Sequence, residues 1–306
     1  MSGLYPTMAC KPPVIDGLYA DPDLYYEDGT FYIYPTTDGF PHWSGNKFYV
    51  FTSRNGTHFE RSAELMDVAS DQVPWASGYA WAPCLAKKGQ RYYFYFCAKD
   101  HRGESAIGVA TADSPLGPFQ AQNEPLITMD KMRSLGICIG QTIDPSVYME
   151  GEDAYRLFGN GAAAVAKLSP DMLHIEDGSV QNIAGLVDFR ESVIVIKRND
   201  LYHFTWSCDD TGSEDYHVNY GTARSLYGPV EYHYPVLQKN ASFGVLGTGH
   251  HSILHLPEED RYLIAYHRFA TPLERYPAGK GWHREVCIAP LIFGDDGLMQ
   301  PVDVTG

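Results

Sequence analysis

Hydrophobic positions along the chain fall into short runs that are separated by polar turns, and these runs do not require a long helix. Residues 20–26 form one strand-like run, residues 31–34 form another, and the polar turn at 27–29 separates them. Two such runs joined by a short turn containing Asp-Gly predict a β-hairpin.

The hairpin pattern recurs four more times along the chain. The later copies begin at residues 81–83 (Trp-Ala-Pro), 143–145 (Ile-Asp-Pro), 190–192 (Arg-Glu-Ser) and 249–251 (Gly-His-His). We take one entry residue of each copy as equivalent: Asp21, Ala82, Asp144, Glu191 and His250. These positions lie about 60 residues apart, with one shorter step, which is near the length of a four-stranded propeller blade. The spacing therefore predicts an all-β, five-bladed β-propeller in which each blade is a four-stranded antiparallel sheet.

A second repeated element supports this prediction. Residues 112–119 (Ala-Asp-Ser-Pro-Leu-Gly-Pro-Phe) and 223–230 (Ala-Arg-Ser-Leu-Tyr-Gly-Pro-Val) share the pattern of one turn. The content of 22 Tyr, 29 Gly and 20 Pro suits many short strands and turns, and 44% hydrophobic residues provide for a sizeable core. Repeat folds reach 306 residues as one unit, so we predict a single β-propeller domain over residues 1–306.

The net charge of −15 disfavours some classes of partner. It would repel nucleic-acid phosphates and anionic membranes, so we expect neither as a partner and expect a neutral partner instead. No run of about 18 apolar residues is present, which predicts no transmembrane helix. Residues 1–10 lack the basic and apolar regions of a secretory signal, so we expect a cytoplasmic location; homo-oligomerisation stays open.

The six cysteines are scattered and form no Cys-x-x-Cys pair. This pattern favours buried free thiols in a reducing compartment over a disulfide framework or a zinc site.

The entry residues of the five copies carry the candidate chemistry. Radial repetition brings the innermost strands to one central channel, where Asp21, Asp144 and Glu191 would converge. Hydrolysis of a glycosidic bond needs one carboxylic acid to protonate the leaving oxygen and one carboxylate to attack or to activate water. A third acid nearby raises the proton affinity of the first. A single acid at a strand start could be a turn former, but three in register predict an active site.

Two further loops admit more than one interpretation. Phe40 and Trp43 lie in an aromatic loop over residues 36–43, where they could pack within the loop or stack on a sugar. Residues 158–162 (Phe-Gly-Asn-Gly-Ala) have the glycines of a dinucleotide loop, but no βαβ pattern follows, so a turn between strands is predicted there.

The order and spacing of these motifs resemble those of glycoside hydrolase family 43, over about residues 13–302. The resemblance implies a five-bladed propeller and an inverting hydrolysis, with Asp21 as general base, Glu191 as general acid and Asp144 as the residue that orients the sugar and modulates the pKa of the acid. It also implies that Trp81 packs under the sugar and that Arg284 binds a ring hydroxyl or holds a carboxylate. His250 would lie on the axis close to a water-coordinated calcium ion.

The chain departs from the family pattern at two positions. The general acid of relatives is commonly followed by Gly or Ala and then Pro, whereas Ser192 and Val193 follow here, so Asp188 is kept as the alternative acid. Cys84 replaces the acid that usually follows Trp-Ala-Pro.

The resemblance implies an exo-acting β-xylosidase or α-L-arabinofuranosidase that releases terminal xylose or arabinofuranose from pentose-containing oligosaccharides. An endo-arabinanase of the same fold, with an open groove, and a non-catalytic sugar-binding propeller are the alternatives. The choice between the two pentoses depends on pocket loops such as residues 36–47, 64–79 and 126–141.

Overall fold

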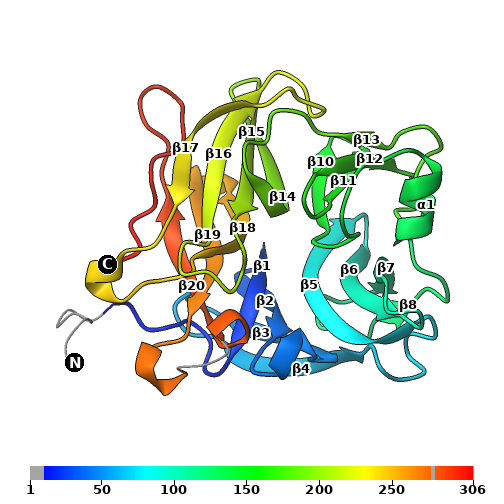
Figure 1. The fold of residues 1–306 in the computed structure, drawn as a ribbon, viewed down its shortest axis with the longest axis horizontal. Coiled ribbons are helices and arrows are strands. Elements are labelled where there is room, and N and C mark those ends of the chain that lie inside the picture. Colours follow the sequence, from blue (N-terminus) through cyan, green and yellow to red (C-terminus); the bar gives the residue numbers. More distant parts are fainter. Residues whose placement is uncertain (1–9, 277–279, 306) are drawn as a thin grey trace.

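Five small antiparallel sheets surround a central axis in the computed structural model, which describes residues 10–276 and 280–305 (Figure 1). The chain passes from one sheet to the next in sequence order, so the five sheets are the blades of a propeller. The prediction of an all-β, five-bladed propeller is confirmed. Within the described residues, α1 (Met129–Ser134) is the one α-helix, and no helix is long and apolar enough to cross a membrane.

Each blade is a run of consecutive strands, with the first strand nearest the axis. Blade 1 contains β1 (Tyr19–Glu27), β2 (Thr30–Thr37), β3 (Lys47–Ser53) and β4 (Glu60–Asp67). Blade 2 contains β5 (Ala76–Lys88), β6 (Arg91–Asp100), β7 (Ser105–Ala112), β8 (Gln120–Ala121) and β9 (Ile127–Thr128). Blade 3 contains β10 (Ser146–Glu150), β11 (Asp153–Phe158), β12 (Ala164–Leu168) and β13 (Gln181–Asn182). Blade 4 contains β14 (Phe189–Arg198), β15 (Leu201–Cys208), β16 (His217–Ala223) and β17 (Glu231–Leu237). Blade 5 contains β18 (Gly249–Leu256), β19 (Arg261–Phe269) and β20 (Arg284–Leu291).

Three blades have the four strands expected for each blade, and the other two differ at their outer edges. In blade 2, β8 and β9 both pair with β7. The segment between them contains Pro125, which has no backbone N–H to offer the sheet and so suits an interruption of the edge strand. The described residues of blade 5 form a sheet of three strands.

The hydrophobic core lies mainly between neighbouring blades. Tyr34 and Phe48 of blade 1 pack with Phe94 and Phe96 of blade 2, and all four side chains are fully buried. Leu157 of blade 3 and Trp206 of blade 4 are part of another such cluster. Burial of each large apolar side chain contributes about 1.5–3 kcal/mol, so these layers hold the blades together.

Polar contacts connect the blades where the inner strands end. Glu150 at the end of β10 accepts hydrogen bonds from Lys197 at 2.7 Å and Tyr202 at 2.9 Å, both from blade 4. Glu27 at the end of β1 makes the same contacts with Lys87 and Tyr92 of blade 2. We call each set of acid, lysine and tyrosine a blade clasp.

Candidate active site

The inner strands share one backbone irregularity near their first residues. The pairing register shifts between Ala20 and Asp23, between Trp81 and Cys84, between Glu191 and Ile194, and between Gly249 and Ser252. The residue at the start of each bulge has a positive φ, and Asp144 before β10 has one too: Asp21 (48°), Ala82 (41°), Asp144 (59°), Ser192 (55°) and His250 (38°). Bulges redirect side chains, and here they occur where the inner strands enter the channel.

The bulges correct the proposed equivalence in blade 4. The residue that matches Asp21 and His250 in backbone conformation is Ser192, and Glu191 precedes it. Glu191 instead matches Trp81, which also precedes a bulge residue and lines the pocket. A bulge places two residues opposite one, and this count cannot be read from hydrophobic alternation, so the alignment was wrong by one residue.

Most of the predicted site residues line one pocket of about 450 Å³. The predicted residues found there are Asp21, Trp43, Trp81, Asp144, Glu191, His250 and Arg284. Phe40 is not among the lining residues, and 46% of its surface is exposed. The loop therefore directs Trp43, and not Phe40, into the pocket. The other loops expected to shape the pocket contribute Tyr79 and Gln141.

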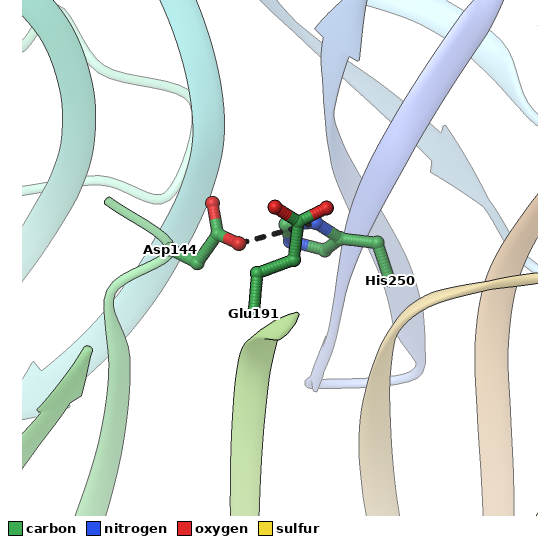
Figure 2. A group of neighbouring side chains, drawn as sticks. All are labelled: Asp144, Glu191 and His250. Carbon is green, nitrogen blue, oxygen red and sulfur yellow. Dashed lines mark ion pairs between the residues drawn. The ribbon is translucent and has the colours of Figure 1, made fainter. Parts of the chain in front are cut away.

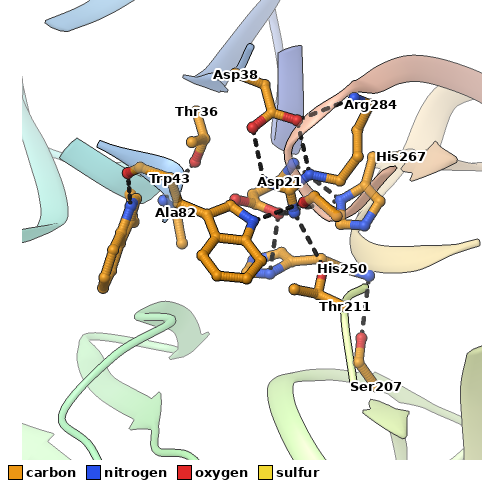
Figure 3. Close-up of polar contacts among 12 residues, drawn as sticks. Asp21, Thr36, Asp38, Trp43, Ala82, Ser207, Thr211, His250, His267 and Arg284 are labelled. Atoms are coloured by element: carbon orange, nitrogen blue, oxygen red, sulfur yellow. Dashed lines mark hydrogen bonds and ion pairs between the residues drawn. The ribbon is translucent and has the colours of Figure 1, made fainter. Parts of the chain in front are cut away.

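Asp21 is surrounded by nitrogen atoms of Arg284 and two histidines (Figure 3). Its Oδ1 lies 3.2 Å from Nη1 of Arg284, 3.0 Å from Nδ1 of His267 and 3.3 Å from Nδ1 of His250. Burial alone would raise the pKa of Asp21, but Arg284 and the two histidines outweigh it and hold the pKa well below its usual value. Burial, with a contribution from Arg284, lowers the pKa of His267 to about 3. Asp21 is therefore an ionised carboxylate beside a neutral His267.

Arg284 is held in place by Asp38. Its Nε donates to Oδ2 of Asp38 at 2.8 Å, and Nη2 lies 3.2 Å from Oδ1 (Figure 3). A carboxylate and a guanidinium bonded in this way fix each other's orientation. Arg284 also contacts the carboxylate of Asp21, and its contact with a ring hydroxyl stays a prediction. Asp38 and His267 were not singled out from the sequence, because both contact the site from distant parts of the chain.

Asp144 lies close to Glu191 and His250 (Figure 2). Burial raises the pKa of Asp144 well above its ordinary value, and repulsion from Glu191 and Asp21 adds to the rise. Its Oδ2 is buried without a hydrogen-bond partner and lies 3.7 Å from Nδ1 of His250. This environment favours a proton on Asp144.

Glu191 is held by two neutral donors. Nδ2 of Asn160 donates to Oε2 at 2.9 Å, and the hydroxyl of Tyr216 donates to Oε1 at 2.9 Å. Asp188, the alternative acid, is exposed and is not among the lining residues of the pocket. Of the two candidates for the acid, Asp188 and Glu191, only Glu191 therefore lies in the pocket with Asp21 and Asp144.

Aromatic side chains form one wall of the pocket. Nε1 of Trp81 donates to the backbone oxygen of Trp43 at 2.7 Å, and Nε1 of Trp43 donates to that of Gly281 at 2.6 Å. Tyr79 packs edge-on against Trp81 at 5.4 Å, and Nζ of Lys99 lies 5.5 Å from the Trp81 ring. Rings fixed in this way offer amphipathic faces to a ligand that has both apolar and hydroxyl surfaces.

His250 belongs to the candidate metal-binding group of the described residues, together with Asp144 and Glu191. One potential ligand atom from each side chain lies within 4.8 Å of the others. The two carboxylates, one of them with an unpartnered buried oxygen, fit part of a calcium shell, which needs further oxygens such as waters. The imidazole of His250 would contact such an ion through a water, because calcium takes oxygen ligands. The donor set thus suits a hard cation in chemistry but supplies fewer protein ligands than a closed site.

All six cysteines are free, as predicted. Cys84, Cys97, Cys208 and Cys287 are buried, whereas Cys138 is exposed and Cys10 is half-buried. Burial raises the pKa of Cys84 to about 12, so this thiol in the place of the family's usual acid stays neutral.

A pocket at the entry of a five-bladed propeller, with three carboxylates and an aromatic wall, defines a glycosidase. The sequence model of glycosyl hydrolases family 43 matches residues 10–299. The chain belongs to this family, and the resemblance noted from the motifs is confirmed.

Several characterised proteins are similar to the chain over nearly its whole length. A β-D-galactofuranosidase of Aspergillus niger is 28% identical over 96% of the chain and 85% of its own length. A xylosidase/arabinosidase of Bacteroides ovatus is 26% identical over 96% of the chain and 98% of its own length. A family 43 β-xylosidase/α-arabinofuranosidase from a compost metagenome, solved with xylotriose in a calcium-free form, has a TM-score of 0.76 at 25% identity and covers 96% of the chain and 98% of its own.

Proposed function

We propose that the protein is an inverting, exo-acting glycoside hydrolase that releases terminal xylose or arabinofuranose from pentose-containing oligosaccharides. The observation that carries this proposal is the unequal environment of the carboxylates around one pocket. Asp21 is kept ionised by Arg284, whereas Asp144 favours its protonated form. Carboxylates whose pKa values are pushed apart are suited to different acid and base roles.

Asp21 is the proposed general base. Its three nitrogen contacts all use Oδ1, so we assign Oδ2 the task of accepting a proton from the attacking water. The charge of Arg284 keeps this carboxylate ionised, and the hydrogen bonds fix its orientation. Water activated by Asp21 would attack the anomeric carbon from the face opposite to the leaving group.

Glu191 is the proposed general acid. Asp144 is the neighbouring acid whose protonation state sets the charge of the carboxylate cluster. Glu191 would donate a proton to the glycosidic oxygen as the bond to the anomeric carbon breaks. The negative charge left on Glu191 would then be stabilised by the hydrogen bonds from Asn160 and Tyr216. Asp144, when protonated, removes one charge from the cluster and can donate a hydrogen bond to the sugar.

The shape of the pocket supports exo action. Side chains from separate blades surround it, with His42 and Trp43 from a loop of blade 1, Tyr79 and Trp81 from β5 of blade 2, and Thr211 from a loop of blade 4. An endo-acting enzyme needs an open groove that lets the polysaccharide chain pass on both sides. We place the terminal sugar against the wall of Trp43 and Trp81, with the leaving group toward Tyr79 and Lys99.

We place a calcium ion near His250, held largely through waters, with the carboxylates of Asp144 and Glu191 close by. Such an ion would supply positive charge that offsets the repulsion among the carboxylates. The calcium-free form of the compost-metagenome relative supports testing for this ion.

The assay compares release of p-nitrophenol from the β-xyloside, the α-L-arabinofuranoside and, because of the relative from Aspergillus niger, the β-D-galactofuranoside. We expect turnover of at least one of the first two, with loss of activity in Asp21→Asn. Products from linear arabinan of many lengths would indicate an endo-arabinanase instead, and binding of xylotriose without turnover of any substrate would indicate a sugar-binding propeller.

The inversion is tested by NMR of the sugar first released. We expect an anomer opposite to that of the substrate, with carboxyl groups of Asp21 and Glu191 about 6.5–9.5 Å apart in a substrate complex. Release of the same anomer would make Asp21 a nucleophile and would contradict the assignment.

A further inference from the structure

The glycine-rich loop after β11, which the sequence alone predicts to be a simple turn, presents a side chain to the active site. Gly159 has a φ of +129°, and a Cβ atom there would lie 2.3 Å from the backbone oxygen of Ala162. The N–H of Gly161 donates to the oxygen of Arg190 at 2.8 Å, and the N–H of Gly140 donates to the oxygen of Asn160 at 2.7 Å. The loop is therefore fixed from both sides, with the amide of Asn160 directed at Oε2 of Glu191.

Tyr216 reaches the other oxygen of Glu191 from the segment before β16. Its ring is fully buried and stacks on His267, with 5.6 Å between ring centroids and 4° between planes. Gly249 leaves the space for this ring, because a Cβ atom at that position would lie 2.2 Å from Cε1 of Tyr216. Burial raises the pKa of Tyr216 well above its ordinary value, and the charge of Glu191 adds to the rise. The hydroxyl thus remains a hydrogen-bond donor at all working pH values.

Ser207 connects Tyr216 to His250. The side chain of Ser207 is hydrogen-bonded to Tyr216, and its Oγ accepts the backbone N–H of His250 at 3.0 Å. The hydroxyl of Tyr216 is therefore oriented by a partner of its own. A donor with this support holds its direction better than a free rotor does.

We propose that Tyr216 and Asn160 are positioning residues for the proton donor of the reaction: together they fix both oxygens of Glu191 and stabilise the anion that remains after proton transfer. This inference rests on the proposed function of Glu191. A glutamate side chain has several rotatable bonds, and small displacements of a catalytic group reduce rates strongly. Both donors are neutral, so they hold the carboxyl in either protonation state, and they bind the anion more strongly.

The proposal predicts a dependence on the leaving group. A nitrophenolate departs without protonation, whereas the sugar of a natural disaccharide needs the proton. Tyr216→Phe and Asn160→Ala should each lower kcat/KM on xylobiose or the matching arabinobiose by about 10-fold or more, and on the p-nitrophenyl glycoside by only a few-fold.

Tyr220→Phe is the matched control. Tyr220 is also fully buried in blade 4, where its hydroxyl lies 2.7 Å from Nδ1 of His203, away from the pocket lining. We expect this variant to lose thermal stability without a leaving-group dependence.

Glu191→Gln separates failure of the inference from failure of the proposed function. If Glu191→Gln shows the leaving-group dependence but Tyr216→Phe and Asn160→Ala lose activity equally on both substrates, the positioning role is wrong. If Glu191→Gln itself shows no such dependence, the general-acid assignment fails, and the positioning inference fails with it.

Discussion

Asp21 and Asp144 are two aspartates at equivalent backbone positions whose surroundings give them opposite charge states. Three nitrogen atoms contact Oδ1 of Asp21, whereas Oδ2 of Asp144 is buried without a partner. Sequence motifs predicted that both residues belong to the site. They could not predict this difference, because it depends on Arg284, which is 263 positions from Asp21, and on Asp38, which is 246 positions from Arg284.

Removal of the cation beside Asp21 should change the pH dependence of activity. In Arg284→Met, burial of Asp21 would no longer be offset by Arg284, so more of the base would be protonated near neutral pH. We expect kcat/KM on the aryl glycoside to fall about 100-fold or more at pH 6, and the acid limb of its pH profile to move upward. An unmoved acid limb in a folded variant would contradict the role of Arg284 in keeping Asp21 ionised.

Substitution of Asp144 should increase stability while it reduces activity. Because the pKa of Asp144 is raised on folding, the folded protein binds more protons than the unfolded chain between the two pKa values, and its free energy of unfolding falls as pH rises through that window. Asp144→Asn should therefore be more stable than the parent at pH 7 by about 1 kcal/mol or more, and the difference should shrink toward pH 4.

Urea unfolding at the two pH values measures this difference. Activity of Asp144→Asn should fall on both the disaccharide and the aryl glycoside, since the residue affects the acid and the sugar alike. The opposite result is that the free energy of unfolding of Asp144→Asn, measured relative to the parent, is lower at pH 7 than at pH 4. That result would show that Asp144 is charged in the folded protein.

The hairpins were predictable from sequence because alternation, turn residues and spacing are local signals. The bulges at the entries of the inner strands were not, and the one-residue error at Glu191 and Ser192 follows from them. Phe40 was assigned to the pocket for a related reason: an aromatic residue in a loop carries no sign of which way the loop turns it. Asn160 could have been found from the glycines on either side of it, which mark a constrained loop.

The blade clasps should contribute to stability without affecting catalysis. Tyr202→Phe removes a hydroxyl that lies 2.9 Å from Oε1 of Glu150, at the end of the inner strands away from the pocket. We expect a loss of about 1 kcal/mol and a fall in Tm of about 2 °C, with unchanged kcat/KM. Tyr232→Phe, at an exposed position of the same blade, is the control for thermal unfolding and should change Tm less.

The propeller as a whole joins groups that are far apart in the sequence. The backbone N–H of Val14 donates to the oxygen of Val286 at 2.9 Å, which links the beginning of the described chain to its last strand. The proposed catalytic residues come from different blades, so the site exists only when the ring is closed. A ligand that binds the site should therefore stabilise the whole fold.

Calcium offers a test of this coupling. If a calcium ion binds near His250, addition of calcium to the chelated protein should raise Tm. The free energy of unfolding should rise by about 2.7 kcal/mol at a calcium concentration 100 times Kd. Thermal unfolding with and without chelator, together with elemental analysis of the purified protein, measures the effect. Identical Tm values and no bound metal would exclude calcium as a resident ion.

The shared left-handed backbone at the five strand entries has a consequence for protein engineering. Two of the five entries, Ala82 and Ser192, carry no ionisable group, yet their backbone already has the conformation of Asp21 and His250. An aspartate or histidine introduced at either position would have a Cα–Cβ bond directed like that of Asp21 or His250, without any redesign of a loop. New chemistry could thus be added to this pocket one blade at a time, with the other blades left as they are.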